Sequence, residues 1–220
     1  MSNTIRNALL LMCIFTFPSG CVSTPPPKEP TPVEQRETSV MTARETRVIE
    51  VNKELFTAAF HGRTSEAKAF FEAQEDEEVR MKDGWTALLL ACGRGHTEVV
   101  LALVEAGVNV NGATACGGTA LMWAAGARER STETVKVLLE AGARVNAKTH
   151  SGSTALMDAS MHGNTETVRV LLEAGAGVNE RTEDGVTALM EASRLGHEEI
   201  VQLLRNAGAL DEPGDWEVVL

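Results

Sequence analysis

Few residues of this sequence have the types and spacing that catalysis or metal binding requires. His96 and Glu98 lie in the stretch HTEVV, which lacks the second histidine of a zinc-binding HExxH helix. Gly93 and Gly95 lack the third glycine of a nucleotide-binding loop. No serine, histidine and acid stand in a recognised nucleophile motif. We therefore expect no catalytic residue, no metal ion and no cofactor, and we interpret the chain as a protein that is not an enzyme.

The segments that position the side chains are repeated along the chain. A threonine near the start of each full repeat recurs at spacings of 33, 35 and 33 residues, as Thr86, Thr119, Thr154 and Thr187. A glycine closes each of these repeats, as Gly107, Gly142, Gly175 and Gly208. Self-similarity at this period predicts a stacked array in which each repeat buries its core against its neighbours.

Each repeat is expected to hold two helices of different character. The first is short and rich in small residues, such as Ala87 and Ala91, which lets neighbouring first helices pack closely. The second carries a stripe of apolar residues at i, i+3 and i+4. The stripes are Val100, Leu103 and Val104, then Val135, Leu138 and Leu139, then Val168, Leu171 and Leu172. The closing glycine follows, where a helix most readily ends in a left-handed conformation.

The full repeats read, for example, GWTALLLACGRGHTEVVLALVEAGVNVN from Gly84 and GVTALMEASRLGHEEIVQLLRNAGAL from Gly185. They resemble the ankyrin repeat, GxTPLHxAAxxGHxxVVxLLLxxGAxVN, over residues 51–210. The resemblance implies an all-α ankyrin repeat solenoid of about five helix-turn-helix units with finger loops, stacked along a curve. The proline and histidine of the family's TPLH are absent. Alanine and an apolar residue replace them, so the hydrogen bonds of that histidine are lost and burial must contribute more.

The repeats and the segments outside them divide the chain into successive parts. We expect a signal peptide at 1–20, a disordered proline-rich linker at 21–50, an N-terminal capping repeat at 51–82, second, third and fourth repeats at 83–113, 114–148 and 149–181, a C-terminal fifth repeat at 182–211, and a tail at 212–220. In the fifth repeat Arg205 replaces an apolar residue, as a cap requires. The third repeat carries two extra residues around 127–132, which are either tolerated drift or a contact element.

The first 21 residues have the anatomy of a secretory signal peptide. Arg6 precedes the apolar run Ala8–Phe17, which is shorter than the roughly 20 residues that a transmembrane helix needs. The tetrad PSGC ending at Cys21 resembles a bacterial lipobox, except that Pro18 stands where an aliphatic residue is usual. Five of the seven prolines follow between positions 25 and 32, which favours an extended stalk.

We therefore expect export, with lipidation of Cys21 and, because Val22 follows it, an anchor in the outer membrane on the periplasmic side. Ordinary cleavage without a lipid, or a retained short anchor, are the alternatives. Cys92 and Cys116 could pair in an oxidising periplasm, but neighbouring repeats do not guarantee Cα atoms within about 7 Å. We favour a buried, unpaired Cys92.

The formal charge of −11 bears on the class of partner. It disfavours nucleic acid and anionic lipid surfaces, both of which bind through basic residues, while basic patches on proteins remain suitable. We expect a monomer that contacts the membrane only through its N-terminal lipid.

The resemblance also indicates where a protein partner would bind, on a concave face formed by the fingers and the exposed edge of the first helices. That face would show Trp85, Arg94, Trp123, His150, Asp158, Met161, His162, Arg181, Glu183, Glu191 and Arg194. Tryptophan and arginine are residue types that dominate interface energies, although Trp123 stands in a helix column and could instead pack between repeats. We expect His96 and His197 to have structural roles in the turn, and His61 and His162 to face solvent.

The expected function is binding of a protein partner, of unknown identity, in the bacterial cell envelope. Two alternatives stay open: an immunity-like inhibitor of a toxin that acts in the periplasm, and a purely structural scaffold of the envelope.

Overall fold

The computed structural model describes residues 54–72, 86–127 and 131–210. The expected signal peptide, linker and tail lie outside the described residues, as do Cys21, Trp85 and part of the lengthened turn in the third repeat.

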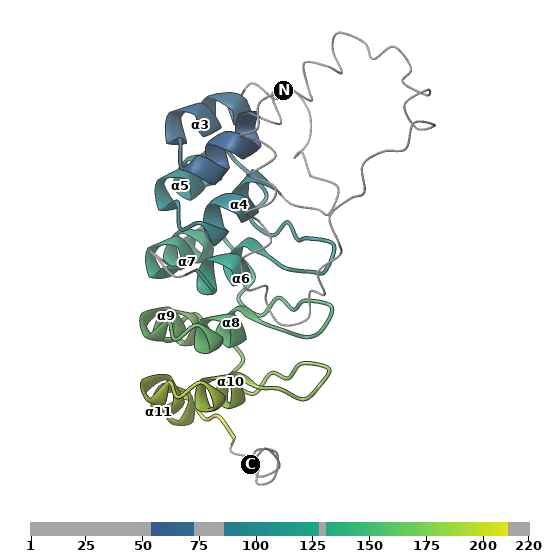
Figure 1. Ribbon diagram of the computed structural model, residues 1–220, viewed down its shortest axis with the longest axis vertical. Helices are drawn as coiled ribbons and strands as arrows, with labels where there is room; N and C mark the ends of the chain where they lie inside the picture. Colours follow the sequence, from purple (N-terminus) through teal and green to yellow (C-terminus); the bar gives the residue numbers. More distant parts are fainter. Residues whose placement is uncertain (1–53, 73–85, 128–130, 211–220) are drawn as a thin grey trace, which may run out of the picture.

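Pairs of antiparallel helices are stacked along one axis (Figure 1). In chain order they are a helix over 54–61 with α3 (Thr64–Glu72), α4 (Ala87–Gly93) with α5 (Thr97–Glu105), α6 (Ala120–Ala125) with α7 (Ser131–Glu140), α8 (Ala155–Met161) with α9 (Thr165–Glu173), and α10 (Ala188–Arg194) with α11 (Glu198–Asn206). The first helices α4, α6, α8 and α10 lie between the second helices and a set of long loops, the fingers, that project to one side. This is the predicted all-α solenoid of helix-turn-helix repeats.

The recurring threonine begins the first helix of a repeat. Thr86, Thr154 and Thr187 have extended backbones, and their hydroxyl oxygens accept the backbone N–H three residues on at 3.2 to 3.5 Å. Such a cap satisfies one N–H that the first turn of a helix leaves without a partner. Thr119 makes no such bond, and its helix relies on burial.

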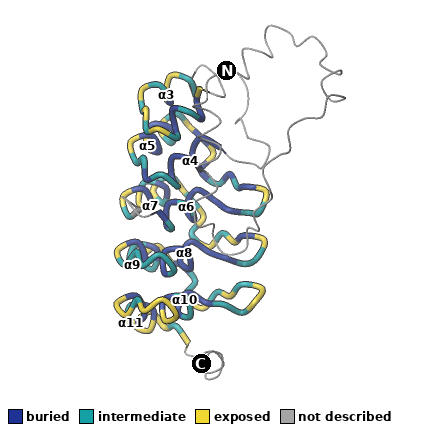
Figure 2. The backbone as a smooth tube through the Cα atoms, viewed as in Figure 1, coloured by how far each residue is buried: buried dark blue, intermediate teal, exposed yellow. Residues whose placement is uncertain are grey.

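The core runs through the stack as continuous columns (Figure 2). The second-helix residues Val100, Leu103, Val135, Leu138, Val168 and Leu171 are fully buried, as their spacing predicted. Where the family pattern has histidine, the residues Leu89, Met122 and Met157 are also buried. Arg205 is exposed at the last repeat, which fits the predicted cap. Burial therefore replaces the missing polar contacts of the TPLH sequence.

An asparagine joins the loop after one repeat to the loop after the next. Asn146 donates from Nδ2 to the carbonyl oxygen of Gly175 at 3.1 Å, and its Oδ1 accepts from the backbone N–H of Gly177 at 2.8 Å. Asn111 and Asn179 make the equivalent bonds to the repeats that follow them. Gly175 has a φ of 86°, so the carbonyl that Asn146 binds belongs to the predicted left-handed helix end. This row of asparagines was not among the predicted contacts.

Hydrogen bonds join the fingers of the third, fourth and fifth repeats to one another. Within the fourth repeat's finger, the N–H of Thr149 bonds the carbonyl oxygen of Ser153 at 2.9 Å. In the fifth, the N–H of Glu183 bonds the carbonyl oxygen of Ser151 at 2.9 Å, which ties the two fingers together. Gly152 has a φ of 85°, and a Cβ atom there would lie 2.9 Å from the Cα of Thr182. Only glycine fits this turn, so the fingers form a fixed platform.

None of the helices in the described part of the chain has the length and apolar character needed to cross a membrane.

Candidate functional site

We define the candidate site, the concave face, by three finger residues (His150, Arg181 and Glu183) and four residues of the first helices or their turns (Arg94, Met161, Glu191 and Arg194). The three finger residues are exposed. The backbone N–H of His150 bonds the carbonyl oxygen of Cys116 at 2.9 Å, so this exposed side chain projects from a backbone position that is fixed. Arg181 donates from Nη1 to the carbonyl oxygen of Gly185 in its own finger at 3.3 Å.

Trp123, on α6, packs between repeats. It is partly buried against the core cluster. A Cβ atom at Gly93 would lie 3.5 Å from Cε3 of the indole, and one at Gly118 would lie 3.2 Å from its Nε1. The indole therefore fills the space between α4 and the finger of its own repeat. Of the two interpretations of Trp123, the structure supports packing.

Arg94 lies over an aromatic ring of the preceding repeat. Its Cζ atom is 3.7 Å from the centroid of the Phe60 ring. The side chain is half-buried, and this burial lowers the pKa of Arg94. A guanidinium over a ring face is attracted by the ring's quadrupole, so the contact orients Arg94 at the edge of the concave face.

Asp158 is buried, and the expectation that it is exposed on the concave face is wrong. Its side chain lies on α8, and the residue is 2% exposed. Neither carboxylate oxygen has a hydrogen-bond partner within the described part of the chain. Burial, and secondarily the negative charge of Glu191, raise the pKa of Asp158 well above its usual range. The helix pair that follows covers this position, which a single sequence does not reveal.

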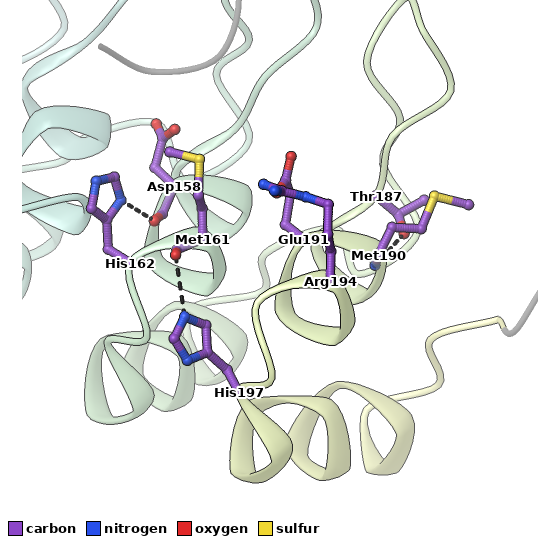
Figure 3. Close-up of polar contacts among 8 residues, drawn as sticks. All are labelled: Asp158, Met161, His162, Thr187, Met190, Glu191, Arg194 and His197. Carbon is purple, nitrogen blue, oxygen red and sulfur yellow. Dashed lines mark hydrogen bonds and ion pairs between the residues drawn. The ribbon is translucent and has the colours of Figure 1, made fainter. Parts of the chain in front are cut away.

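Glu191 occupies on α10 the position that Asp158 has on α8, four residues after the capping threonine (Figure 3). Its Oε2 atom lies 2.7 Å from Nη2 of Arg194, one turn further along the same helix. Glu191 is half-buried and Arg194 is exposed. Glu191 therefore has a cationic partner, Arg194, while Asp158 has none within the described part of the chain.

The histidines in the turns between helices form hydrogen bonds to backbone carbonyl oxygens. His96 and His197 use Nε2 to bond the carbonyl oxygens of Phe60 and Met161, at 3.1 and 3.3 Å, in the preceding repeats. Their predicted structural role is confirmed. His162 was expected to face solvent and does not: it is half-buried, and its Nδ1 bonds the carbonyl oxygen of Asp158 at 2.8 Å (Figure 3). His61 is exposed, as expected.

Asn164 stands in the fourth repeat where His96 and His197 stand in theirs. Its Nδ2 donates to the carbonyl oxygens of Ala125 at 2.6 Å and Ala127 at 3.0 Å, at the start of the lengthened turn in the third repeat. The described end of that turn is therefore held by a neighbouring repeat.

Cys92 and Cys116 do not pair with each other. Cys92 is a free, buried thiol, and burial strongly raises its pKa. The favoured interpretation of Cys92 is confirmed. Among the residues that the structure describes, no three histidine, cysteine or acidic side chains come together as metal ligands.

Comparison with known families agrees with this geometry. The family model described as Ankyrin repeats (3 copies) matches residues 55–149 and 127–212, which together span more than half of the chain. No curated protein matches the chain.

Proposed function

Because the chain belongs to the ankyrin repeat family, we propose that it binds a protein partner on its concave face. Ankyrin repeats are generally modules for protein-protein interaction, and their fold is typically a scaffold without catalytic function. The finer statement, that this chain binds its partner through the fingers and first helices, rests on how residue types are distributed in the structure.

The observation that carries the proposal is the contrast between two columns of the first helices. Two residues after the capping threonine, every full repeat has a buried leucine: Leu88, Leu121, Leu156 and Leu189. Four residues after it, the same repeats have four different types: Leu90, Trp123, Asp158 and Glu191. The first column builds the stack. The second column differs in residue type from repeat to repeat although Leu90 and Asp158 are buried, so the residues beside the concave face are not fixed by the repeat pattern.

Site-specific photocrosslinking tests the proposal. A benzophenone amino acid at His150 or Arg181 places the probe on exposed finger positions, and the same amino acid at Lys136 or Glu173 places it on exposed second-helix positions of α7 and α9. We expect the finger positions to capture one protein species from envelope fractions and the second-helix positions to capture none. Equal capture from both sets would instead support a scaffold that contacts its neighbours through all of its surface.

A combined variant supplies the quantitative measure. Alanine at His150, Arg181 and Arg194 removes exposed side chains of the concave face and leaves the buried columns intact. We expect the captured species to bind this variant at least tenfold more weakly, since exposed arginines are frequent hot-spot residues. Unchanged affinity would place the interface elsewhere.

We also propose that the chain is exported and held at the outer membrane by a lipid on Cys21, facing the periplasm. The support is the sequence of residues 1–21 and the run of prolines that follows it. Mass spectrometry of the mature N-terminus tests this directly. We expect a lipidated Cys21, and an N-terminus without lipid would contradict the proposal. Replacing Cys21 by alanine would release the protein from the membrane fraction if the lipid is its anchor.

A further inference from the structure

The edge column of the first helices changes character along the array. Leu90 and Trp123 occupy it in the second and third repeats, and Asp158 and Glu191 occupy it in the fourth and fifth. Leu90 is buried and Trp123 packs against the core, so the fold is satisfied by apolar residues at this position. The two carboxylates are therefore not required by the stack.

Asp158 has no cation among the helices that pack against its own. Helix α8 packs against α6, α9 and α10. Helix α6 reads ALMWAA and has no charged residue. On α9, Arg169 is 43% exposed and lies near Glu166 and Glu199 rather than Asp158. On α10, Arg194 pairs with Glu191 at 2.7 Å.

The remaining charged groups near α8 do not satisfy the carboxylate either. His162 follows on the same chain segment, but its Nδ1 bonds the backbone carbonyl oxygen of Asp158 and not the side chain. Both carboxylate oxygens of Asp158 are buried without a partner in the described part of the chain. Buried carboxylates are normally hydrogen-bonded or paired, because removing them from water is costly. A buried carboxylate without a partner, next to a second carboxylate, is a position that a cation would stabilise.

The side chains of Asp158 and Glu191 point the same way from their two helices in Figure 3. Met161 lies one turn from Asp158 on α8 and projects on the same side. Met161 is half-buried, and an unbranched thioether side chain changes rotamer readily. Met161 is therefore the side chain on α8 next to Asp158 that moves most readily.

We propose that the protein partner inserts an arginine or lysine side chain between Asp158 and Glu191, displacing Met161. Arginine fits best, since its planar guanidinium has five N–H donors and can bond two carboxylates at once. The inference rests on the proposed binding of a partner to the concave face and names the chemistry by which that partner is recognised.

The test uses the full chain and small probes. N-acetyl-arginine amide is the cationic probe, and N-acetyl-citrulline amide, similar in shape but neutral, is its control at equal ionic strength. Carboxyl-detected NMR follows the side chain of Asp158 through a pH titration. We expect the arginine probe to lower the pKa of Asp158 and the citrulline probe to leave it unchanged. Equal effects of the two probes, or no effect at about 100 mM, two orders above a millimolar Kd, would overturn the proposal.

Variants give a second measurement. In Asp158→Asn the shifts that the arginine probe induces on α8 and α10 should require at least tenfold more probe. Asp184→Asn removes the same charge from an exposed finger position and should leave the titration unchanged. Equal loss in both variants would mean that the probe senses net charge alone and would also overturn the proposal.

The two proposals fail separately. If the probe does not respond to Asp158 but crosslinks still form at His150 and Arg181, the concave face binds a partner by other chemistry. If no crosslinks form there, the proposed function fails whatever the probe does.

Discussion

Replacing Asp158 with asparagine should make the protein more stable, by an amount that grows with pH. The amide is nearly the same shape as the carboxyl group and cannot ionise, so the change removes the titration and little of the packing. Asp158 is 2% exposed and its pKa is raised, first by burial and then by Glu191. Ionising it in the folded state therefore costs more than ionising it in the unfolded chain.

The sign and slope follow from proton linkage. In the unfolded chain the carboxyl group ionises near its ordinary pKa of about 3.9, while in the folded protein it keeps its proton to a higher pH. Above about pH 4 the unfolded state binds fewer protons, so the free energy of unfolding falls as pH rises. Between the pKa of the unfolded state and that of the folded state, Asp158 alone lowers the free energy of unfolding by up to about 1.4 kcal/mol per pH unit. Below the pKa of the unfolded state, the group causes no such loss.

Urea unfolding followed by circular dichroism measures the effect. The difference in unfolding free energy between Asp158→Asn and the parent should increase from pH 4 to neutral pH. Titrating groups that do not interact with Asp158 contribute equally to both proteins and cancel in this difference. Asp184→Asn makes the same change of charge at an exposed finger position, and its difference should vary less with pH than that of Asp158→Asn. If the Asp158→Asn difference is flat over this range, the folded carboxyl group ionises normally and the reasoning from burial is refuted.

Three further outcomes test the contacts of the stack. Asn146→Ala removes two hydrogen bonds to the next repeat and should lower the unfolding free energy by about 1–2 kcal/mol. Asn109→Ala affects only a bond within its own loop and should lower it by less. Equal losses would contradict a role of Asn146 between repeats. Gly152→Ala should destabilise the protein more than Gly142→Ala in the same urea assay. Both glycines have a φ near 86°, which costs alanine about 1–2 kcal/mol. Of the two, only at Gly152 would the added Cβ atom also lie within 3 Å of the next finger. Cys92, buried and with a raised pKa, should react with iodoacetamide about 100-fold more slowly in the native protein than in urea, and rapid native labelling would show that its repeat opens.

Most of the fold could be predicted from the sequence because the stack imposes the same demands on every repeat. The apolar stripes, the threonine near the start of each repeat and the closing glycine each recur at the repeat period, and the structure places Val168 and Gly175 in the expected roles. Asn146 recurs at the same period too, as Asn111 and Asn179. Its role was missed because an exposed asparagine in a loop does not indicate that both its donor and its acceptor reach the next repeat.

The site could be predicted only as a region. Exposed finger residues such as His150 and Arg181 lie where the resemblance put them, because finger backbones follow the repeat. The expected exposure is wrong for Asp158 and His162, and Trp123 packs between repeats. Burial at the edge of a first helix depends on which side chains the neighbouring repeats contribute. Polar residues are exposed in most proteins, but a polar residue is buried where another repeat covers its position.

The contrast between Asp158 and Glu191 shows how an array can retain a costly residue. In a solenoid, stability is approximately the sum of terms within repeats and between neighbours, so the loss at one position is offset by interfaces on both sides. Asp158 lies in the fourth repeat, between α6 and α10, where both neighbours cover it. Glu191 lies in the fifth, is half-buried and has Arg194 as its ion-pair partner. The unpaired carboxylate thus stands where the stack can best compensate for it. The cost of keeping it there, when leucine serves in the second repeat, is the physical reason to look for a cation on the partner.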